Sequence, residues 1–341
     1  MSPQPRAISS IVKSMSNDNV HRISVVIPVY GGSATLRQVV AELSDFYSVQ
    51  TSPNGLKYCI SEVILVDDCG KDNSDLVIRE LALGNDLVLP VWLTRNFGQH
   101  AATIAGMASS SGEWVVTMDE DGQHDPSSIG LLLDTAVSGK CPLVYGRESN
   151  REPHGFLRNL SSRLVKQVVL PLLVESKSFR YFSSFRLMTG EVARTVGAFA
   201  NQGAYLDIAL SWIARTSEVC NVSYRDELRT RSGYSTRKLF SHFLRLVVSS
   251  GTRPLRVISA IGVVAFVAGV IGAITVTLGK YFGDYPVGGW ASLFSLVLIL
   301  GGAVLLALGI IAEYLGVLVR RSIGLPLYVI GNDPHHGPLH K

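Results

Sequence analysis

Two long stretches without a charged residue, both near the C-terminus, constrain this chain most. The first, Val257–Gly279, has 23 residues, and the second, Tyr285–Ala312, has 28. At about 1.5 Å of rise per residue, a helix of either length would exceed the roughly 30 Å hydrocarbon core of a bilayer. They also explain an apolar-shifted composition, with 47% apolar and only 17% charged residues. We therefore predict transmembrane helices over residues 255–279 and 285–312.

Basic residues flank the two predicted spans, whereas the turn between them, GKYFGD, carries one lysine and one aspartate. The positive-inside rule predicts that both termini are cytoplasmic and that this turn lies outside. The formal net charge of +4 is too small to argue for nucleic-acid binding, but it suits an anionic membrane surface when clustered. The flanking basic residues are Arg237, Lys238, Arg245, Arg253, Arg256, Arg320 and Arg321.

Three further segments adjoin the spans or the N-terminus. Residues 1–20 are polar and lack the apolar run of a signal peptide, so we expect a flexible leader. Residues 236–254 carry an apolar helical face, which is typical of a helix in the membrane interface or of one packed on a soluble domain. We expect residues 313–341 to form a cytoplasmic tail that is flexible. The four widely spaced cysteines predict free thiols in a reducing compartment.

Residues 21–235 alternate short apolar runs with helical stretches. The runs ISVVIPVY, EVILVDD, VLPVWLTRN, EWVVTMDED and PLVYG predict buried strands, and segments such as ATLRQVVAELSDFY and HAATIAGMASS separate them. This alternation predicts an α/β domain with a mostly parallel sheet covered on both faces. Ligands of such sheets bind beyond the carboxyl ends of the strands, where this chain places polar residues. These are Asp67, Asp68, Arg95, Asn96, Asp119, Glu120, Asp121 and Arg147.

The segment Asp119–Gln123 predicts a metal site. In an extended chain alternate residues face the same way, so Asp119 and Asp121 can point into one pocket while Glu120 faces away. With the Gln123 amide oxygen, they offer hard oxygen ligands that suit Mg²⁺ or Mn²⁺ bridging substrate phosphates. A metal-bridged diphosphate indicates a nucleotide-activated substrate. The absence of G-x-G-x-x-G and of G-x-x-x-x-G-K-[ST] after the first strand disfavours a dinucleotide-binding oxidoreductase and a P-loop protein.

The joint order of these motifs resembles the family 2 glycosyltransferases. VVIPVY, ILVDD, TRNFGQHAA and MDEDGQHDP, followed by a basic segment and two spans, are similar to the polyprenyl-phosphate glycosyltransferases, relatives of dolichyl-phosphate mannose synthase and of bactoprenol glycosyltransferases. The resemblance implies a GT-A fold that moves a sugar from a nucleotide donor to a polyprenyl phosphate. It also implies undecaprenyl phosphate as acceptor, a bacterial inner membrane and a homo-oligomer.

The resemblance assigns roles to individual residues. Asp119, Asp121 and Gln123 would hold the metal, and Gly31-Gly32-Ser33 stands where the family usually has Asn-Glu. The nucleotide site would comprise Pro28, Tyr30, Asp67, Asp68, Asn96, His100, Asp119 and Glu120. The acceptor phosphate would meet Arg158, Ser162, Arg229, Arg231, Ser232, Tyr234 and Arg237. The catalytic set would be Asp119, Asp121, Arg147, Arg158 and Ser162.

The chemistry of the acceptor simplifies the expected mechanism. A phosphate monoester is already ionised near pH 7, so its attack needs no general base, unlike that of a sugar hydroxyl. In-line attack would invert the anomeric centre. Asp207 lies where a base could lie, but we expect a structural role for it. Two alternatives stay open, a membrane glycosyltransferase that extends a polysaccharide and a non-catalytic scaffold that binds nucleotide-sugar.

Overall fold

The structure is a computed structural model, which describes residues 20–148, 182–199, 206–225, 289–322 and 326–335, together with positions 262, 264, 267, 271, 274 and 278. Several predictions fall outside these residues. They are the leader up to residue 19, the amphipathic helix over 236–254, most of the first span, and the acceptor-site residues Arg158, Ser162, Arg229, Arg231, Ser232, Tyr234 and Arg237.

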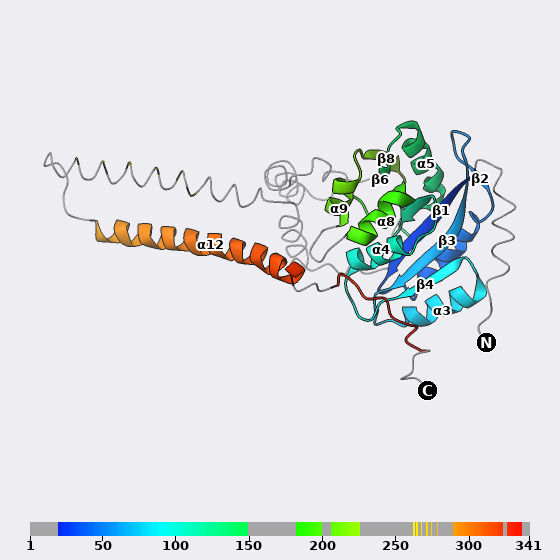
Figure 1. Ribbon diagram of the computed structural model, residues 1–341, viewed down its shortest axis with the longest axis horizontal. Coiled ribbons are helices and arrows are strands. Elements are labelled where there is room, and N and C mark those ends of the chain that lie inside the picture. Colours follow the sequence, from blue (N-terminus) through cyan, green and yellow to red (C-terminus); the bar gives the residue numbers. More distant parts are fainter. Residues whose placement is uncertain are drawn as a thin grey trace.

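The described part folds into an α/β domain and one long helix, α12, which projects away from it (Figure 1). The strands are β1 (Val20–Val29), β2 (Gln50–Thr51), β3 (Lys57–Asp67), β4 (Val88–Trp92), β5 (Trp114–Thr117), β6 (Leu143–Glu148), β7 (Arg186–Thr189) and β8 (Glu218–Val222). The helices are α2 (Leu36–Ser44), α3 (Ser74–Gly84), α4 (Gln99–Ala108), the short 3₁₀ helix η1 (Pro126–Ser128), α5 (Ile129–Ser138), α8 (Gly190–Phe199), α9 (Leu206–Ile213) and α12 (Trp290–Ser322).

The sheet is mixed, in the order β2-β3-β1-β5-β7-β6-β8, with β4 paired to β3. The predicted strands run parallel, β1 with β3 and β5, and β3 with β4. Strands β2, β7 and β8 were not predicted, and β7 enters antiparallel between β5 and β6. The α/β expectation is thus confirmed. The expectation of a mostly parallel sheet is corrected beyond β5, where β7 is antiparallel to both of its neighbours. The sequence did not indicate β7, because its four residues, RLMT, are too few to form a recognisable strand pattern.

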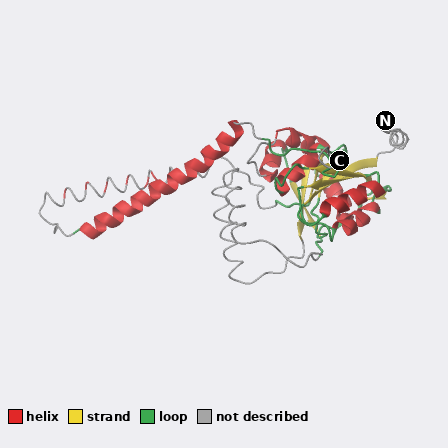
Figure 2. Cartoon of the chain, turned by 90° about the horizontal axis from the view of Figure 1, so that it is seen from below, coloured by secondary structure: helices red, strands yellow, loops and turns green. Residues whose placement is uncertain are grey.

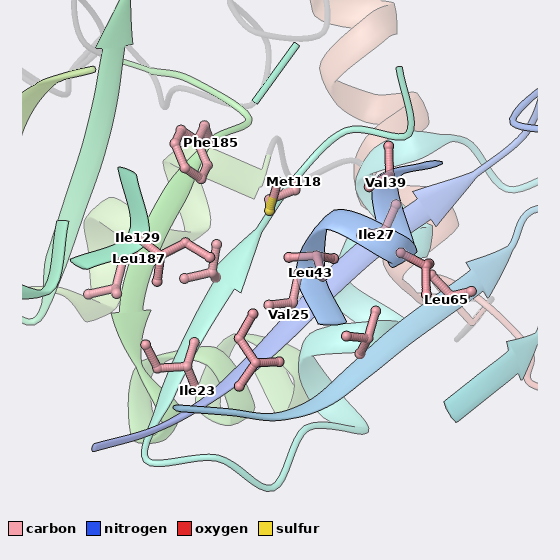
Figure 3. Close-up of a cluster of buried hydrophobic side chains, with 14 of the residues drawn as sticks. Ile23, Val25, Ile27, Val39, Leu43, Leu65, Met118, Ile129, Phe185 and Leu187 are labelled. Atoms are coloured by element: carbon pink, nitrogen blue, oxygen red, sulfur yellow. The ribbon is translucent and has the colours of Figure 1, made fainter. Parts of the chain in front are cut away.

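Side-chain alternation along the central strands builds two cores. On β1, Ile23, Val25, Ile27 and Val29 enter the core under α2, α3 and α5. Figure 3 shows part of this core, including Ile23, Val25 and Ile27. Val26 enters the other core, under α4, α8 and α9. The sheet is therefore buried on both faces, which is why its strands are almost continuously apolar.

Helix α12 overlaps the second predicted span and continues ten residues beyond its end at residue 312. Figure 2 shows it as the long helix that leaves the domain. Among the described residues, no helix is both long and apolar enough to cross a membrane.

Residues 326–335, after α12, return to the α/β domain. Leu93 of the chain following β4 forms an antiparallel bridge with Ile330. Thr94 N–H donates to Val329 O at 3.0 Å, and Gly331 N–H donates to Trp92 O at 2.8 Å. The expectation of a flexible tail is therefore wrong for this segment, because the open edge of β4 offers backbone groups that the tail can pair with.

Candidate active site

The candidate site lies at the carboxyl ends of the parallel strands. Val29 of β1 is paired with Asp67 of β3, and β5 ends at Thr117, two residues before Asp119. The chain segments that follow β1, β3, β4 and β5 therefore meet at one edge of the sheet. The sequence predicted polar residues in the segments after β3, β4 and β5, and the structure brings these segments together there.

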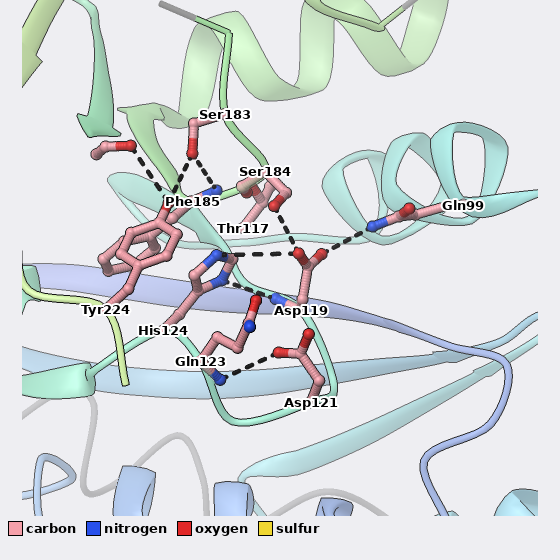
Figure 4. Close-up of polar contacts among 11 residues, drawn as sticks. Gln99, Thr117, Asp119, Asp121, Gln123, His124, Ser183, Ser184, Phe185 and Tyr224 are labelled. Carbon is pink, nitrogen blue, oxygen red and sulfur yellow. Dashed lines mark hydrogen bonds and ion pairs between the residues drawn. The ribbon is translucent and has the colours of Figure 1, made fainter. Parts of the chain in front are cut away.

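The carboxylate of Asp119 is held from two sides (Figure 4). Gln99, at the start of α4, donates from Nε2 to Asp119 Oδ1 at 2.7 Å. Ser184, just before β7, donates from Oγ to Asp119 Oδ2 at 2.6 Å. These bonds fix the orientation of Asp119 before any ligand binds, and they leave lone pairs on both oxygens.

The Asp121 carboxylate accepts a hydrogen bond from the backbone N–H of Gln123 at 3.0 Å. Burial raises the pKa of Asp121, and the nearby negative charge of Asp119 raises it further. The hydrogen bond from Gln123 acts in the opposite direction. A divalent cation would relieve both causes, because it would compensate for lost hydration and offset the repulsion between the two carboxylates. The residues present therefore fit Mg²⁺ or Mn²⁺.

The number of protein ligands also fits a metal that is shared with substrate. In the part of the chain that the structure describes, no group of three or more His, Cys, Asp or Glu side chains could hold a metal ion. Two carboxylates and the Gln123 amide oxygen leave positions for phosphate oxygens and water, which is how Mg²⁺ is usually bound.

His124 holds the loop Asp119–Gln123 in place. Its ring is almost completely buried, stacked on Phe185 with centroids 4.8 Å apart and edge-on to Tyr224. The Asp119 N–H donates to His124 Nδ1 at 3.0 Å, so Nε2 carries the proton in the neutral ring and faces Asp119 Oδ2 at 3.9 Å. Burial lowers the pKa of His124, so the neutral form holds the loop.

Glu120 turns away from Asp119 and binds the turn after β1. Its carboxylate accepts from Tyr30 N–H at 2.9 Å and from Gly31 N–H at 3.0 Å. A Cβ at Gly32 would lie 2.7 Å from Glu120 Oε2, so a larger residue there would displace the Glu120 carboxylate. The backbone of the turn at Tyr30 and Gly31 thus binds Glu120.

The two acids at the end of β3 differ in their surroundings. Asp68 accepts from Phe97 N–H at 2.7 Å and Gly98 N–H at 2.9 Å, and therefore holds the segment before α4. Asp67 is buried, and its Oδ1 has no hydrogen-bond partner. Burial raises the pKa of Asp67 to about 6, although the amides of Gly70 and Cys69 act in the opposite direction. Asp67 is thus the acid of this pair that a ligand could satisfy.

The remaining predicted residues of the described part lie around this edge. Tyr30 is exposed just past β1, and Pro28 is buried within β1 opposite Val66. Asn96 is exposed before α4, and His100 lies in its first turn. Arg147 is exposed near the end of β6, which runs parallel to β5 because both pair antiparallel with β7.

Sequence reasoning missed Gln99, Ser184 and His124. Gln99 and His124 lie inside the two motifs that drew attention, so their proximity to named residues was a usable signal. Ser184 lies 65 residues from Asp119, and no local pattern marked it. Asp207 forms a buried ion pair with Arg186 at 2.7 Å, which agrees with the structural alternative for this residue.

Comparison with known proteins decides the family. Residues 24–199, about half of the chain, match Glycosyl transferase family 2. The chain belongs to this family. It is therefore a glycosyltransferase with a GT-A-like α/β domain, and the matched range holds all the strand-end acids described above.

Curated relatives extend the similarity beyond the α/β domain. The bactoprenol glucosyl transferase of Shigella phage SfV is 29% identical over 317 residues, which are 92% of this chain and 99% of that protein. The undecaprenyl-phosphate 4-deoxy-4-formamido-L-arabinose transferase of Proteus mirabilis is 28% identical over 321 residues, which are 92% of this chain and 94% of that protein. The expected resemblance to polyprenyl-phosphate glycosyltransferases is thereby confirmed.

Proposed function

We propose that this protein transfers a sugar from a UDP-linked donor to a polyprenyl phosphate, specifically undecaprenyl phosphate, at the cytoplasmic face of the inner membrane of a bacterium. The observation that carries the proposal is the convergence of Asp67, Asp119 and Asp121 at one sheet edge in a family 2 chain. Relatives along more than nine tenths of the chain bear names that specify bactoprenol or undecaprenyl phosphate. These names support the choice of acceptor.

The donor half of the site follows from the end of β3 and the segment before α4. Asp67 has an unsatisfied, buried carboxylate oxygen, to which the polar edge of a nucleotide base or ribose could donate. Asn96 and Tyr30 are exposed on either side of this edge and can line the nucleotide. Asp68 fixes the segment through the backbone N–H groups of Phe97 and Gly98, so this side of the proposed nucleotide site is in place before the donor arrives.

A divalent cation would be held by Asp119, Asp121 and Gln123, and when bound it would neutralise charge on the departing diphosphate. Gln99 and Ser184 keep the Asp119 carboxylate oriented, and His124 keeps its backbone in place. Arg147, at the end of β6, is suited to bind the phosphates. These residues would therefore act on the leaving group, where negative charge develops in the transition state.

The acceptor requires little activation. A phosphate monoester is ionised near pH 7, so the protein has only to align its oxygen behind the anomeric carbon. This agrees with Asp207, whose carboxylate is buried and paired with Arg186. In-line attack forms the bond from the acceptor oxygen to the anomeric carbon as the bond to the diphosphate breaks. The anomeric configuration is therefore inverted.

Location at a membrane is part of the proposal. Large apolar side chains are exposed along α12 from Leu293 to Val319, and apolar positions between Val264 and Leu278 in the first predicted span are exposed as well. Exposed apolar surface of this extent is unfavourable in water and suits contact with lipid. We propose two spans with both termini cytoplasmic, and a homo-oligomer that packs through them.

The test uses the full chain in its membranes. Labelled UDP-sugars are offered with undecaprenyl phosphate, and product is extracted into organic solvent and treated with mild acid. We expect a labelled lipid that mild acid hydrolyses, that EDTA prevents from forming, and whose anomeric configuration is opposite to that of the donor. A labelled polymer, or donor binding without transfer under any donor and metal, would overturn the proposal in favour of a polysaccharide-extending enzyme or a binding scaffold.

A further inference from the structure

The C-terminal tail, residues 326–335, packs beside the segment that carries the candidate nucleotide residue Asn96. Tail residue Val329 accepts from Thr94 N–H at 3.0 Å, and Gly331 donates to Trp92 O at 2.8 Å. A Cβ at Gly331 would lie only 3.0 Å from Thr94 Cγ2, so the tail passes very close to the start of this segment. Figure 1 shows the tail, in dark red, running from the end of α12 toward α3.

An ion pair fastens the tail to α3. Arg79 donates from Nε to Asp333 Oδ2 at 3.0 Å and from Nη2 to Asp333 Oδ1 at 2.5 Å. The same guanidinium lies over the ring of Trp92, 5.8 Å from its centre. Beyond Asp333, His335 Nε2 lies 2.8 Å from Asp75 Oδ2. A two-point Arg–carboxylate bond is geometrically specific, so it defines where the tail crosses the edge of β4.

The segment Thr94–Gly98 is therefore held at both ends. The tail fixes its first residue, Thr94, and the carboxylate of Asp68 fixes its last two amides, at Phe97 and Gly98. Immediately after it, Gln99 donates to Asp119. Leu327 and Tyr328 of the tail pack against the same core as Phe97. A shift of the tail would thus be passed through Thr94 to Asn96, within a segment whose far end stays fixed by Asp68.

We propose that the C-terminal tail, fastened by Arg79 and Asp333, is a positioning element for donor binding. It acts on the donor pocket through Thr94 without touching the donor itself. Only residues 323–325 separate the tail from α12, the proposed membrane helix. The tail therefore links this helix along the chain to the segment that carries Asn96. The effect on the nucleotide rests on the proposed function, whereas the effect on the Thr94–Gly98 segment does not.

The neighbour of Arg79 on α3, Glu80, offers a control ion pair. Arg37 of α2 pairs with Glu80 at 2.5 Å, and these two side chains are 53% and 62% exposed. The side chains of Arg79 and Asp333 are only 18% and 21% exposed. Arg79→Gln and Arg37→Gln thus remove the same chemical group from two ion pairs on α3, of which one fastens the tail.

The experiment compares Arg79→Gln, Asp333→Asn, the exchange Arg79→Asp with Asp333→Arg, and the control Arg37→Gln, all in the full chain. We expect both single variants to raise the donor KM and weaken UDP binding about five- to tenfold, with kcat and acceptor KM unchanged. We expect the exchange to recover most of this loss. Equal donor KM in Arg79→Gln and Arg37→Gln, or no recovery by the exchange when both variants are folded, would overturn the proposal.

Hydrogen exchange separates this inference from the proposed function. The amides of Thr94 and Gly331 should lose protection in Arg79→Gln and keep it in Arg37→Gln, whatever donor the enzyme uses. Unchanged protection at Thr94 would overturn the positioning role even in an active enzyme. If protection is lost but no UDP-sugar is a substrate, the proposed donor is wrong and the attachment of the tail stands.

Discussion

Strand β3 carries two acids five residues apart that the fold treats in opposite ways. Glu62, in the middle of the strand, accepts from Ser24 Oγ at 2.5 Å, from Ser111 N–H at 2.6 Å and from Ser111 Oγ at 3.0 Å. Asp67, at the end of the strand, has a buried Oδ1 without a partner and a pKa raised to about 6 by burial. Both are at least nine tenths buried, so burial alone does not distinguish them.

The difference lies in where their hydrogen bonds come from. The donors of Glu62 all belong to the protein, and they tie β3 to β1 and to the chain after α4. Asp67, together with Asp121 after β5 at the same edge of the sheet, retains an energetic cost that a ligand could remove. A satisfied buried acid stabilises the fold, and an unsatisfied one at a strand end stores free energy for binding.

The largest expected effect concerns Asp121, one of the acids that a ligand could satisfy. Asp121→Ala should lower kcat by about 10³-fold, because it removes a metal ligand at the point where the diphosphate departs. Its melting temperature should not fall, since the repulsion between Asp119 and Asp121 is relieved. Asp45→Ala, an exposed acid on the chain after α2, serves as control. An Asp121→Ala enzyme within threefold of that control would refute the metal assignment.

Glu62, whose hydrogen bonds all come from the protein, should affect stability and not kcat. Glu62→Ala should lower the free energy of unfolding by about 3 kcal/mol, because it leaves the buried Ser24 hydroxyl without its acceptor and removes both hydrogen bonds from Ser111. Well below its melting temperature, kcat should match that of the wild type. Chemical denaturation and activity are measured on the same preparation, with the exposed Asp86→Ala as reference. A selective loss of kcat without loss of stability would place Glu62 in the site after all.

The raised pKa of Asp67 predicts the pH dependence of stability. Its folded-state pKa is about 6, against an ordinary value of 3.8 for an aspartic acid, so between these pH values the folded state binds the extra proton. Stability from this group is therefore gained as the pH falls through about 6 and is complete below about 4, and it is absent at pH 7.5. Asp67→Asn should stabilise the ligand-free protein at pH 7.5 by about 3 kcal/mol, because each pKa unit of difference corresponds to about 1.4 kcal/mol.

Comparison of melting at two pH values isolates this group. The gain in stability from Asp67→Asn should shrink toward zero near pH 4, where the wild-type carboxyl is protonated. Burial also raises the pKa of Asp68 and Asp121, but both titrate in either protein, and so they cancel in the difference. A constant difference between pH 4 and pH 7.5 would mean that Asp67 is not the titrating acid.

The smallest expected effect concerns the contact that sequence reasoning missed. Ser184→Ala removes one hydrogen bond from Asp119 Oδ2 and should lower kcat/KM about tenfold, which corresponds to about 1.4 kcal/mol. Ser183→Ala is the neighbouring control, because Ser183 Oγ lies 2.9 Å from Tyr224 Oη and does not contact Asp119. If the two variants lose equal activity, Ser184 acts on the local fold and not through Asp119.

Much of the fold was predictable because its signals are local. Apolar runs of β1, β3, β4 and β5 marked buried strands, and the acids that come with the ends of β3 and β5 marked the edge of the sheet where the candidate site lies. The same runs did not indicate β7, whose place between β5 and β6 depends on pairing across the molecule. The alternation also predicted opposite directions for Glu120 and Asp119, but not that Glu120 would bind the glycine turn after β1.

The sequence by itself determined the class of domain, the family and the acids of the site, because side-chain periodicity and strand-end chemistry are written within a few neighbouring residues. Only the tertiary structure decided which acids are satisfied and which are not. It brought Ser184 to Asp119, Ser24 and Ser111 to Glu62, and the tail to Thr94. Such contacts join residues far apart in the chain, and the packing of the whole domain selects them, so no local pattern records them.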